Sequence, residues 1–370
     1  MDPVTHAALG AVTGELVLGR QIGRRALAWG ALFGVLPDWD AIPCLLMNTA
    51  WDLRIHRGLS HSIILWLLLS WLLAKPLAKR WKKDKVSPRQ VGLFLALAMG
   101  SHILIDVFTV YGTRIFDPFW GFPVSTDNIF VIDPIFTIPL LVAVIIGCFV
   151  KPKEWKKGKG IRSAWWCLGI SFFYIGLSFW AKHTVSSAVT GDLARRGVTA
   201  QRRMEGPTPF NILLWRVVVE RPGEIWVGYR SVFDSRELPI RWVMVPKGEE
   251  AIAKYADQWE VKVVREFSKG WCIAREAPGG LWLVDLRFGE IRTWDERGMG
   301  IRPRFAWTFE AAATKDRLRN KPSDESRGGA ELLRRMVRRI GGEVDSLDGA
   351  STTPRLIGNP GNLQEYLEMK

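Results

Sequence analysis

Cysteine and histidine are both scarce in this chain. Its 370 residues include four cysteines and five histidines, and none of the histidines lies beyond residue 183. Four cysteines are too few for a disulfide scaffold. They form no CxxC pair, so we expect small buried apolar side chains at Cys44, Cys148, Cys167 and Cys272. A hydrophobic content of 48% likewise excludes a disordered chain.

The two halves of the chain differ in composition. Residues 1–182 form long apolar runs with 20 basic and 11 acidic residues, whereas the remainder alternates short apolar runs with 31 basic and 26 acidic residues. The 19 tryptophans suit a protein at a membrane interface. The sequence therefore predicts an α-helical integral membrane domain of four to six helices at 1–183. A β-rich α+β soluble domain at 184–340 and a loosely ordered tail at 341–370 are expected to follow.

Six apolar runs define the expected membrane helices. They are Val4–Leu18, Ala26–Leu36, Ser62–Ala78, Val91–Val110, Val131–Val150 and Ser163–Trp180. Runs of about 15–20 residues fit a bilayer core, although the first two are short or polar for a full span. Whether those two cross completely is left open, because shallow or re-entrant placement is also compatible with them.

Basic residues between the runs predict the topology. Lys79–Arg89 and Lys151–Arg162 each hold six basic residues, and Arg20, Arg24 and Arg25 follow the first run. The positive-inside rule places these stretches in the cytoplasm of a multi-pass protein of the plasma (inner) membrane. The N-terminus and the C-terminal domain are then extracytoplasmic. The first run lacks a basic n-region and a clear cleavage site, so we expect it to be an uncleaved anchor.

The C-terminal half alternates apolar and charged residues as β-strands do. Strands are expected at Ile212–Glu220, Ile225–Phe233, Arg241–Val245, Trp259–Phe267, Trp271–Arg275 and Trp282–Leu286, between Gly- and Pro-containing turn signals. Helices are expected at Glu249–Asp257 and Ser323–Ile340. The runs Lys82-Lys83 and Arg334–Arg339 indicate solvated or lipid-facing surfaces, so membrane lipids and no nucleic acid are the expected partners.

Histidines and aspartates gather in three short motifs of the membrane half. His102 and Asp106 are four residues apart on an apolar helix and share one face. Such a pair is costly in a membrane unless it is paired or bound to something. The other motifs are Pro37-Asp38-Trp39-Asp40 and His56-Arg57-Gly58-Leu59-Ser60-His61. Mixed imidazole and carboxylate groups bind zinc or manganese, so the three motifs together predict a divalent metal site.

Each motif also has a simpler structural reading. The His102–Asp106 pair by itself also fits a structural hydrogen bond, and the Asp38–Asp40 turn by itself fits a surface turn. The two histidines His56 and His61, beside Arg57 and Ser60, also fit an ordinary interfacial loop. The remaining acidic residues and the last histidine are expected to be loop, cap, packing or interface residues: Asp117, Asp127, Asp133, Glu15 and His183. The metal reading is preferred because three separate clusters meet at one expected membrane face.

Taken together, the motifs resemble those of the YdjM-like group of membrane-bound metal-dependent hydrolases. The resemblance covers about residues 1–180 and rests on Thr5-His6, Pro37–Asp40, His56–Ser62, Ser101-His102 and Asp106. The C-terminal part of the chain looks like the extension seen in longer members of this group. The motifs behind this likeness are Pro209-Phe210-Asn211, Trp215-Arg216 and Asp285–Gly289. The resemblance implies an integral membrane protein assigned as a metal-dependent hydrolase, and it supplies no substrate.

The preferred hypothesis is a metal-dependent hydrolase of the outer membrane–water boundary, acting on a phosphoester or ester of a lipid-like substrate. Its expected metal ligands are His6, Asp38, Asp40, His56, His61, His102 and Asp106. Asp40 is the expected general base if it is not a ligand, and Arg57 is expected to hold a phosphate. One alternative is a non-enzymatic, metal-stabilised anchor that presents a C-terminal binding domain. Another is a transporter that uses His102 and Asp106 as a relay.

Overall fold

The computed structural model of the protein describes residues 1–295, 298–320, 329–348 and 355–356. The chain divides into two compact units. The helical unit comprises Met1–Leu46, Ile55–Phe179 and Pro209–Asn211, and the strand-rich unit comprises Met47–Arg54, Trp180–Thr208 and Ile212–Lys370. The expected boundaries of the membrane domain, the soluble domain and the tail, at residues 183/184 and 340/341, stay predictions.

Helices α1 (Pro3–Ile22) and α2 (Arg25–Val35) pack closely because glycines line their contact. A Cβ atom on Gly10 would lie 2.3 Å from the Gly30 carbonyl oxygen, and one on Gly14 would lie 2.2 Å from that of Ala26. Small residues allow such an approach between helices in a membrane, where van der Waals contact drives association. The small-residue pattern of the first run thus sets the α1–α2 distance.

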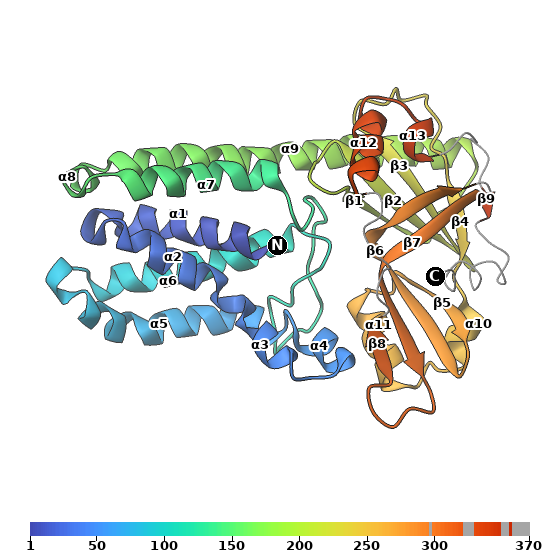
Figure 1. Ribbon diagram of the computed structural model, residues 1–370, viewed down its shortest axis with the longest axis horizontal. Helices are drawn as coiled ribbons and strands as arrows, with labels where there is room; N and C mark the ends of the chain where they lie inside the picture. Colours follow the sequence, from blue (N-terminus) through green and yellow to red (C-terminus); the bar gives the residue numbers. More distant parts are fainter. Residues whose placement is uncertain (296–297, 321–328, 349–354, 357–370) are drawn as a thin grey trace. The chain divides into compact units, whose positions relative to one another are not determined.

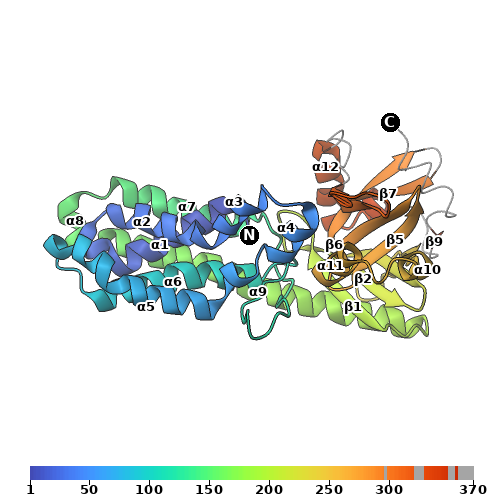
Figure 2. The same ribbon diagram turned by 90° about the horizontal axis from the view of Figure 1, so that it is seen from below.

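The other long helices of this unit begin at side-chain caps. Ser62 caps α5 (Ile63–Arg80), Ser87 and Gln90 form a capping box at α6 (Pro88–Val107), and Asp133 caps α7 (Pro134–Phe149). Helix α9 runs over Lys159–Arg195. In both ribbon views α5 lies beside α6, and α7 lies beside the first part of α9 (Figures 1 and 2). Short elements complete the unit: η1 (Leu36–Asp40), α3 (Ala41–Cys44), η2 (Leu59–His61), η3 (Lys82–Asp84) and α8 (Pro152–Lys156).

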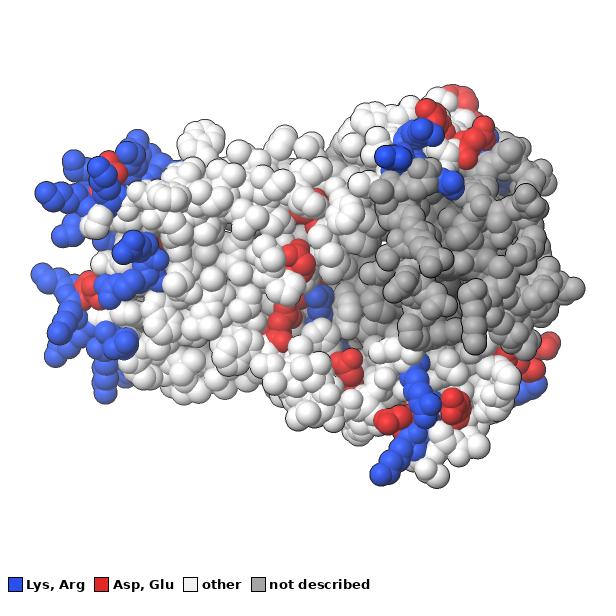
Figure 3. Space-filling view, in the orientation of Figure 1, with Lys and Arg blue, Asp and Glu red and all other residues white. Residues whose placement is uncertain are grey.

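Within the described residues, α6 and α9 are long and apolar enough to cross a membrane. A third candidate is the segment Thr49–His61 with α5, which is bent by 51° at a short break, and α7 is a shorter apolar helix. Lys and Arg side chains gather at one end of the helical unit, next to a broad band without charged side chains (Figure 3). That band is what a hydrocarbon core requires. Whether the remaining expected segments cross the bilayer stays a prediction.

The strand-rich unit contains two sheets. In the first, the order is β1 (Arg202–Pro207), β2 (Leu214–Arg221), β3 (Glu224–Ser231), β4 (Val243–Pro246) and β9 (Arg355–Leu356), antiparallel except for the β4–β9 pair. The second sheet is antiparallel, with the order β5 (Cys272–Ala277), β6 (Gly280–Asp295), β7 (Gly298–Glu310) and β8 (Leu318–Asn320). Val218 and Val227 of the first sheet share a buried core with Ile273 and Val284 of the second.

Helices cover parts of these sheets. The last turns of α9 bury Val185 and Val189 with Trp215 of β2. Met336 of α12 (Gly329–Ile340) is buried with Leu214. The shorter helices are α4 (Thr49–Ile55), α10 (Glu249–Ala253), α11 (Trp259–Phe267) and α13 (Asp345–Asp348). A helical membrane region followed by a strand-rich region therefore agrees with the fold class expected from the sequence.

Three details differ from expectation. The expected strand Trp259–Phe267 is helix α11, whose Val261 and Val264 are buried three residues apart while Lys262 and Arg265 are exposed. The helix expected over the sixth apolar run does not end at Trp180. It is α9, which continues to Arg195. Cys148 is exposed on α7 and is not a buried side chain. Residues 323–328 of one expected helix, and most of the expected tail, lie outside the described residues.

Candidate metal centre

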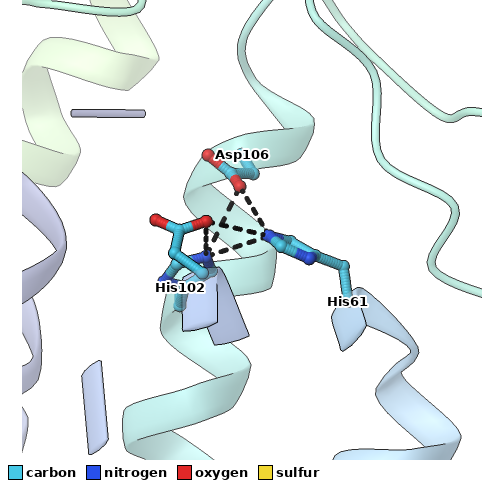
Figure 4. A group of neighbouring side chains, drawn as sticks. His61, His102 and Asp106 are labelled. Carbon is cyan, nitrogen blue, oxygen red and sulfur yellow. Dashed lines mark hydrogen bonds and ion pairs between the residues drawn. The ribbon is translucent and has the colours of Figure 1, made fainter. Parts of the chain in front are cut away.

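Four ligand-type side chains from three elements meet at one end of the helical unit. Asp38 comes from η1, which follows α2 at a proline, and His61 ends η2. His102 and Asp106 lie one turn apart near the end of α6. The four offer ligand atoms that all lie within 4.8 Å of one another. The side chains of His61, His102 and Asp106 point toward a common centre (Figure 4).

The distances within this four-residue cluster are short and uniform. The two Nε2 atoms of His61 and His102 lie 3.2 Å apart. Asp38 Oδ1 lies 3.3 Å from the first and 3.4 Å from the second, and Asp106 Oδ2 lies 3.4 Å and 3.5 Å from them. Around a tetrahedral zinc ion with bonds of about 2.0–2.2 Å, neighbouring ligand atoms lie about 3.3–3.6 Å apart. These five separations are those expected around one small tetrahedral cation, and the sixth pair, the oxygens of Asp38 and Asp106, lies within 4.8 Å.

Hydrogen bonds orient both imidazoles with Nε2 toward the centre. His102 Nδ1 lies 2.7 Å from the Gly34 carbonyl oxygen, which can only accept, so Nδ1 carries the proton. His61 Nδ1 lies 2.9 Å from Ser60 Oγ, which donates to Asp40 Oδ2 at 2.5 Å. Each Nε2 thus presents a lone pair to the other and to two carboxylate oxygens. Four acceptors at such short range require a cation or protons between them.

His6 extends the cluster on its α1 side. Its ring stacks on that of His102 with centroids 3.5 Å apart, and its Nε2 lies 3.2 Å from Asp106 Oδ1 and 4.0 Å from Asp38 Oδ2. In each carboxylate, this is the oxygen that does not face the Nε2 atoms of His61 and His102. The Met1 amino nitrogen also contacts Asp106. The side chain of His6 is fully buried, and neither of its ring nitrogens has a hydrogen-bond partner among the described residues.

Asp40 and His56, both expected ligands, lie outside the four-residue cluster. Asp40 accepts hydrogen bonds from Ser60 Oγ and from the Arg57 backbone N–H at 3.0 Å, and its Oδ1 lies 3.1 Å from His56 Nδ1. Burial alone would raise the pKa of the Asp40 carboxyl, but the bonds to His56 and Ser60 hold that pKa below its ordinary value. Asp40 therefore fixes η1 to the loop that carries His61.

Arg57 is buried beside the cluster. Only 6% of the residue is exposed, its Nη2 lies 3.4 Å from Asp106 Oδ1, and its guanidinium lies over the Tyr111 ring at 4.3 Å. Its Nε and Nη1 are buried without a hydrogen-bond partner among the residues described. Two unused donors on a buried guanidinium are suited to an incoming anion.

The weaker acidic candidates are not members of the four-residue cluster. Asp133 caps α7, as expected, by accepting from the backbone N–H groups of Ile135 and Phe136 at 3.1 and 3.4 Å. It also accepts from the Tyr174 hydroxyl at 2.9 Å. The sequence did not indicate the supporting groups: the Gly34 carbonyl has no residue-type signal, and Ser60 and Tyr111 acquire their roles only through packing.

Comparisons with known proteins identify a family of inner membrane proteins. A family model described as "YdjM inner membrane protein" matches residues 1–185. YfhP of Bacillus subtilis (strain 168), described as uncharacterized, is 31% identical over 153 residues, which cover 40% of this chain and 46% of YfhP. The inner membrane protein YbcI of Escherichia coli (strain K12) is 28% identical over 127 residues, covering 34% of this chain and 70% of YbcI. The chain thus spans less than half the length of YfhP, and no solved structure matches it.

Proposed function

Because this chain belongs to the YdjM inner membrane protein family, we propose that its helical unit is a metal-dependent hydrolase at the membrane–water boundary. The substrate class is a phosphoester or ester of a lipid-like molecule. One observation carries the proposal: two imidazole lone pairs and two carboxylate oxygens converge at separations that suit a small divalent cation.

Asp38, His61, His102 and Asp106 are the proposed ligands. Their mixed nitrogen and oxygen donors suit zinc, and manganese is the second choice. When bound, such an ion lowers the pKa of a coordinated water to about 7 and polarises the scissile oxygen. His6 and the outer oxygen of Asp38 would be the groups for a second ion, since Arg57 and the Met1 amino group already contact the outer oxygen of Asp106. Two-metal sites occur in phosphatases and nucleases.

The chain's own residues supply the remaining parts of the proposed site. Arg57 directs two unused N–H groups toward an anionic oxygen of the substrate. Asp40 is a positioning residue in this proposal and not the general base, since it already accepts from Ser60 and the Arg57 backbone and is paired with His56. Through Ser60 it holds His61 with Nε2 toward the four-residue cluster.

Exposed apolar side chains beside the site support a lipid-like substrate. Trp39 lies between Asp38 and Asp40 with 52% of its surface exposed, and Leu59 precedes Ser60 with 50% exposed. Leu45 and Leu46, just beyond α3, are 84% and 91% exposed. Tryptophan and leucine at the ends of membrane helices favour the headgroup and upper acyl region. The positive-inside rule places this end of the helices on the extracytoplasmic side.

The test is hydrolysis by protein purified in detergent, assayed with a soluble phosphodiester, a soluble ester and phospholipid micelles. Wild type is compared with His61→Ala and His102→Ala, and His183→Ala is the control because His183 lies on α9 in the strand-rich unit. We expect activity that a chelator abolishes and that zinc or manganese restores. Both cluster variants should lose activity while the control keeps it. Retained activity in both cluster variants would refute the proposal.

The second candidate function is a metal-stabilised membrane anchor for the strand-rich unit. The presence of four protein ligand atoms within 4.8 Å of one another favours it, because structural zinc sites are closed whereas catalytic sites keep a position for water. Cobalt substitution separates the two functions. If azide or phosphate changes the visible spectrum of the cobalt-loaded protein, an open position exists and the anchor reading fails. An unchanged spectrum at saturating anion favours the anchor.

A further inference from the structure

A second buried acidic group lies far from the candidate metal centre. Glu15 is on α1, nine residues beyond His6, which places it about 13.5 Å further along the helix at 1.5 Å per residue. None of its surface is exposed. Neither carboxylate oxygen has a hydrogen-bond partner among the described residues. The proposed hydrolase makes no use of this residue.

The surroundings of this carboxyl group are small or apolar. A Cβ atom on Gly160 of α9 would lie 2.3 Å from Glu15 Oε1, and one on Gly147 of α7 would lie 3.2 Å from that oxygen and 3.0 Å from Leu27 Cδ1. Trp155 Cζ3 would lie 3.2 Å from the same Cβ position on Gly160 and 2.7 Å from a Cβ atom on Gly19. The carboxyl group thus lies against the backbones of Gly147 and Gly160, and Leu27 and Trp155 line the same two glycine positions.

Trp155 is also a polar group without a partner. The residue is 2% exposed, and its indole N–H is buried without an acceptor among the described residues. Other titratable groups nearby are the thiol of Cys167 on α9, which interacts electrostatically with Glu15, and the guanidinium of Arg20, which lies by Gly158 on the exposed side of α1. Neither forms an ion pair with Glu15.

An isolated carboxylate in such a place costs several kcal/mol or more, so the group takes up a proton instead. A metal cation is a poor alternative ligand. Calcium or magnesium needs about six or more oxygen ligands, whereas, among the described residues, Glu15 is the one acidic side chain placed at Gly147 and Gly160 by the distances above. Asp106, which is equally buried, contrasts with it because Arg57 and His6 contact its carboxylate.

We propose that Glu15 is a proton-binding site of the membrane domain, a carboxyl group that carries its proton at neutral pH at the junction of α1, α7 and α9. The site is separate from the metal centre and does not depend on the hydrolase proposal. The ligand of this site is the proton. Ionisation of the Glu15 carboxyl group would place an unpaired charge among α1, α7 and α9.

Carbodiimides of two solubilities test this site. The carboxyl proton moves to one nitrogen of the carbodiimide and the carboxylate oxygen bonds to its central carbon. The adduct then rearranges to a stable N-acylurea that mass spectrometry locates on a peptide. Dicyclohexylcarbodiimide enters apolar regions, whereas its water-soluble ethyl(dimethylaminopropyl) analogue does not. The reaction needs a protonated acid, so an ionised carboxylate reacts poorly.

In full-length wild type at neutral pH, we expect the hydrophobic reagent to modify Glu15 and the water-soluble reagent to leave it unmodified. Glu15→Gln, which keeps the side-chain shape, should lose the adduct completely. Trp155→Ala should make Glu15 accessible to the water-soluble reagent. No adduct at Glu15 with the hydrophobic reagent, or equal modification by both reagents in wild type, would overturn the proposal. If either variant fails to fold, the comparison of the two reagents on wild type still tests the proposal.

Discussion

Replacing Ser60 by alanine probes the support of the candidate metal centre without touching a proposed ligand. Ser60 Oγ lies 2.9 Å from His61 Nδ1 and donates to Asp40 Oδ2 at 2.5 Å. The hydroxyl therefore accepts the Nδ1 proton and keeps the lone pair of His61 on Nε2. Without it, His61 is free to adopt the other tautomer or to rotate, and each change misdirects a ligand.

The size of the effect follows from this single contact. Loss of a partner that orients a metal-bound histidine lowers metal affinity about 10- to 100-fold, which corresponds to about 1.4–2.7 kcal/mol. We expect Ser60→Ala to weaken metal binding within this range. His61→Ala should weaken it further, because it removes the ligand itself.

Competition with a chromophoric chelator measures these affinities in detergent. Ser101→Ala is the matched control, since Ser101 is adjacent to His102 but donates to the Ala98 carbonyl within its own helix. The control should bind metal like wild type. If Ser60→Ala binds metal within twofold of wild type while His61→Ala does not bind, the orienting role of Ser60 is wrong.

Three further predictions concern helix packing, anion binding and membrane topology. Gly10→Val places Cβ 2.3 Å from a backbone oxygen of α2 and should cost about 1–3 kcal/mol, seen as a lower melting temperature. Gly169→Val, at a position without neighbours within 4 Å, should not, and equal losses would contradict the packing argument. Arg57→Gln should weaken inhibition by phosphate about 10- to 100-fold, since hydrogen bonds to charged groups contribute about 1.5–3 kcal/mol; unchanged inhibition would exclude Arg57 from anion binding. A reporter fused after Lys182 should be extracytoplasmic and one within Lys82–Lys85 cytoplasmic, and the reverse pattern would overturn the proposed topology.

Helical periodicity and composition were enough for much of the architecture. The i, i+4 spacing of His102 and Asp106 places them on one helix face in any α-helix, so this half of the cluster was predictable. The change from apolar runs to alternating strands predicted a helical region followed by a strand-rich one. Helix α11 was missed because its valines favour strands locally, while their burial three residues apart selects the helix.

Which histidine of the His56–His61 motif faces the cluster was not predictable. The two are five residues apart in a loop, and neither spacing nor residue type distinguishes them. The chain takes a positive φ of 58° at Arg57, and η2 then turns His61 inward while His56 pairs with Asp40. The two aspartates of η1 also differ: Asp38 belongs to the four-residue cluster, whereas Asp40 pairs with His56. Such choices depend on tertiary contacts that local sequence does not encode.

Elemental analysis of detergent-purified protein tests the central claim, that Asp38, His61, His102 and Asp106 hold a divalent metal ion. Wild type, His102→Ala and the control His183→Ala are purified without chelator and measured side by side. The account predicts about one or two zinc or manganese ions per chain in wild type and control, and loss of the metal in His102→Ala. Wild type without stoichiometric metal, or His102→Ala with as much metal as wild type, would contradict it.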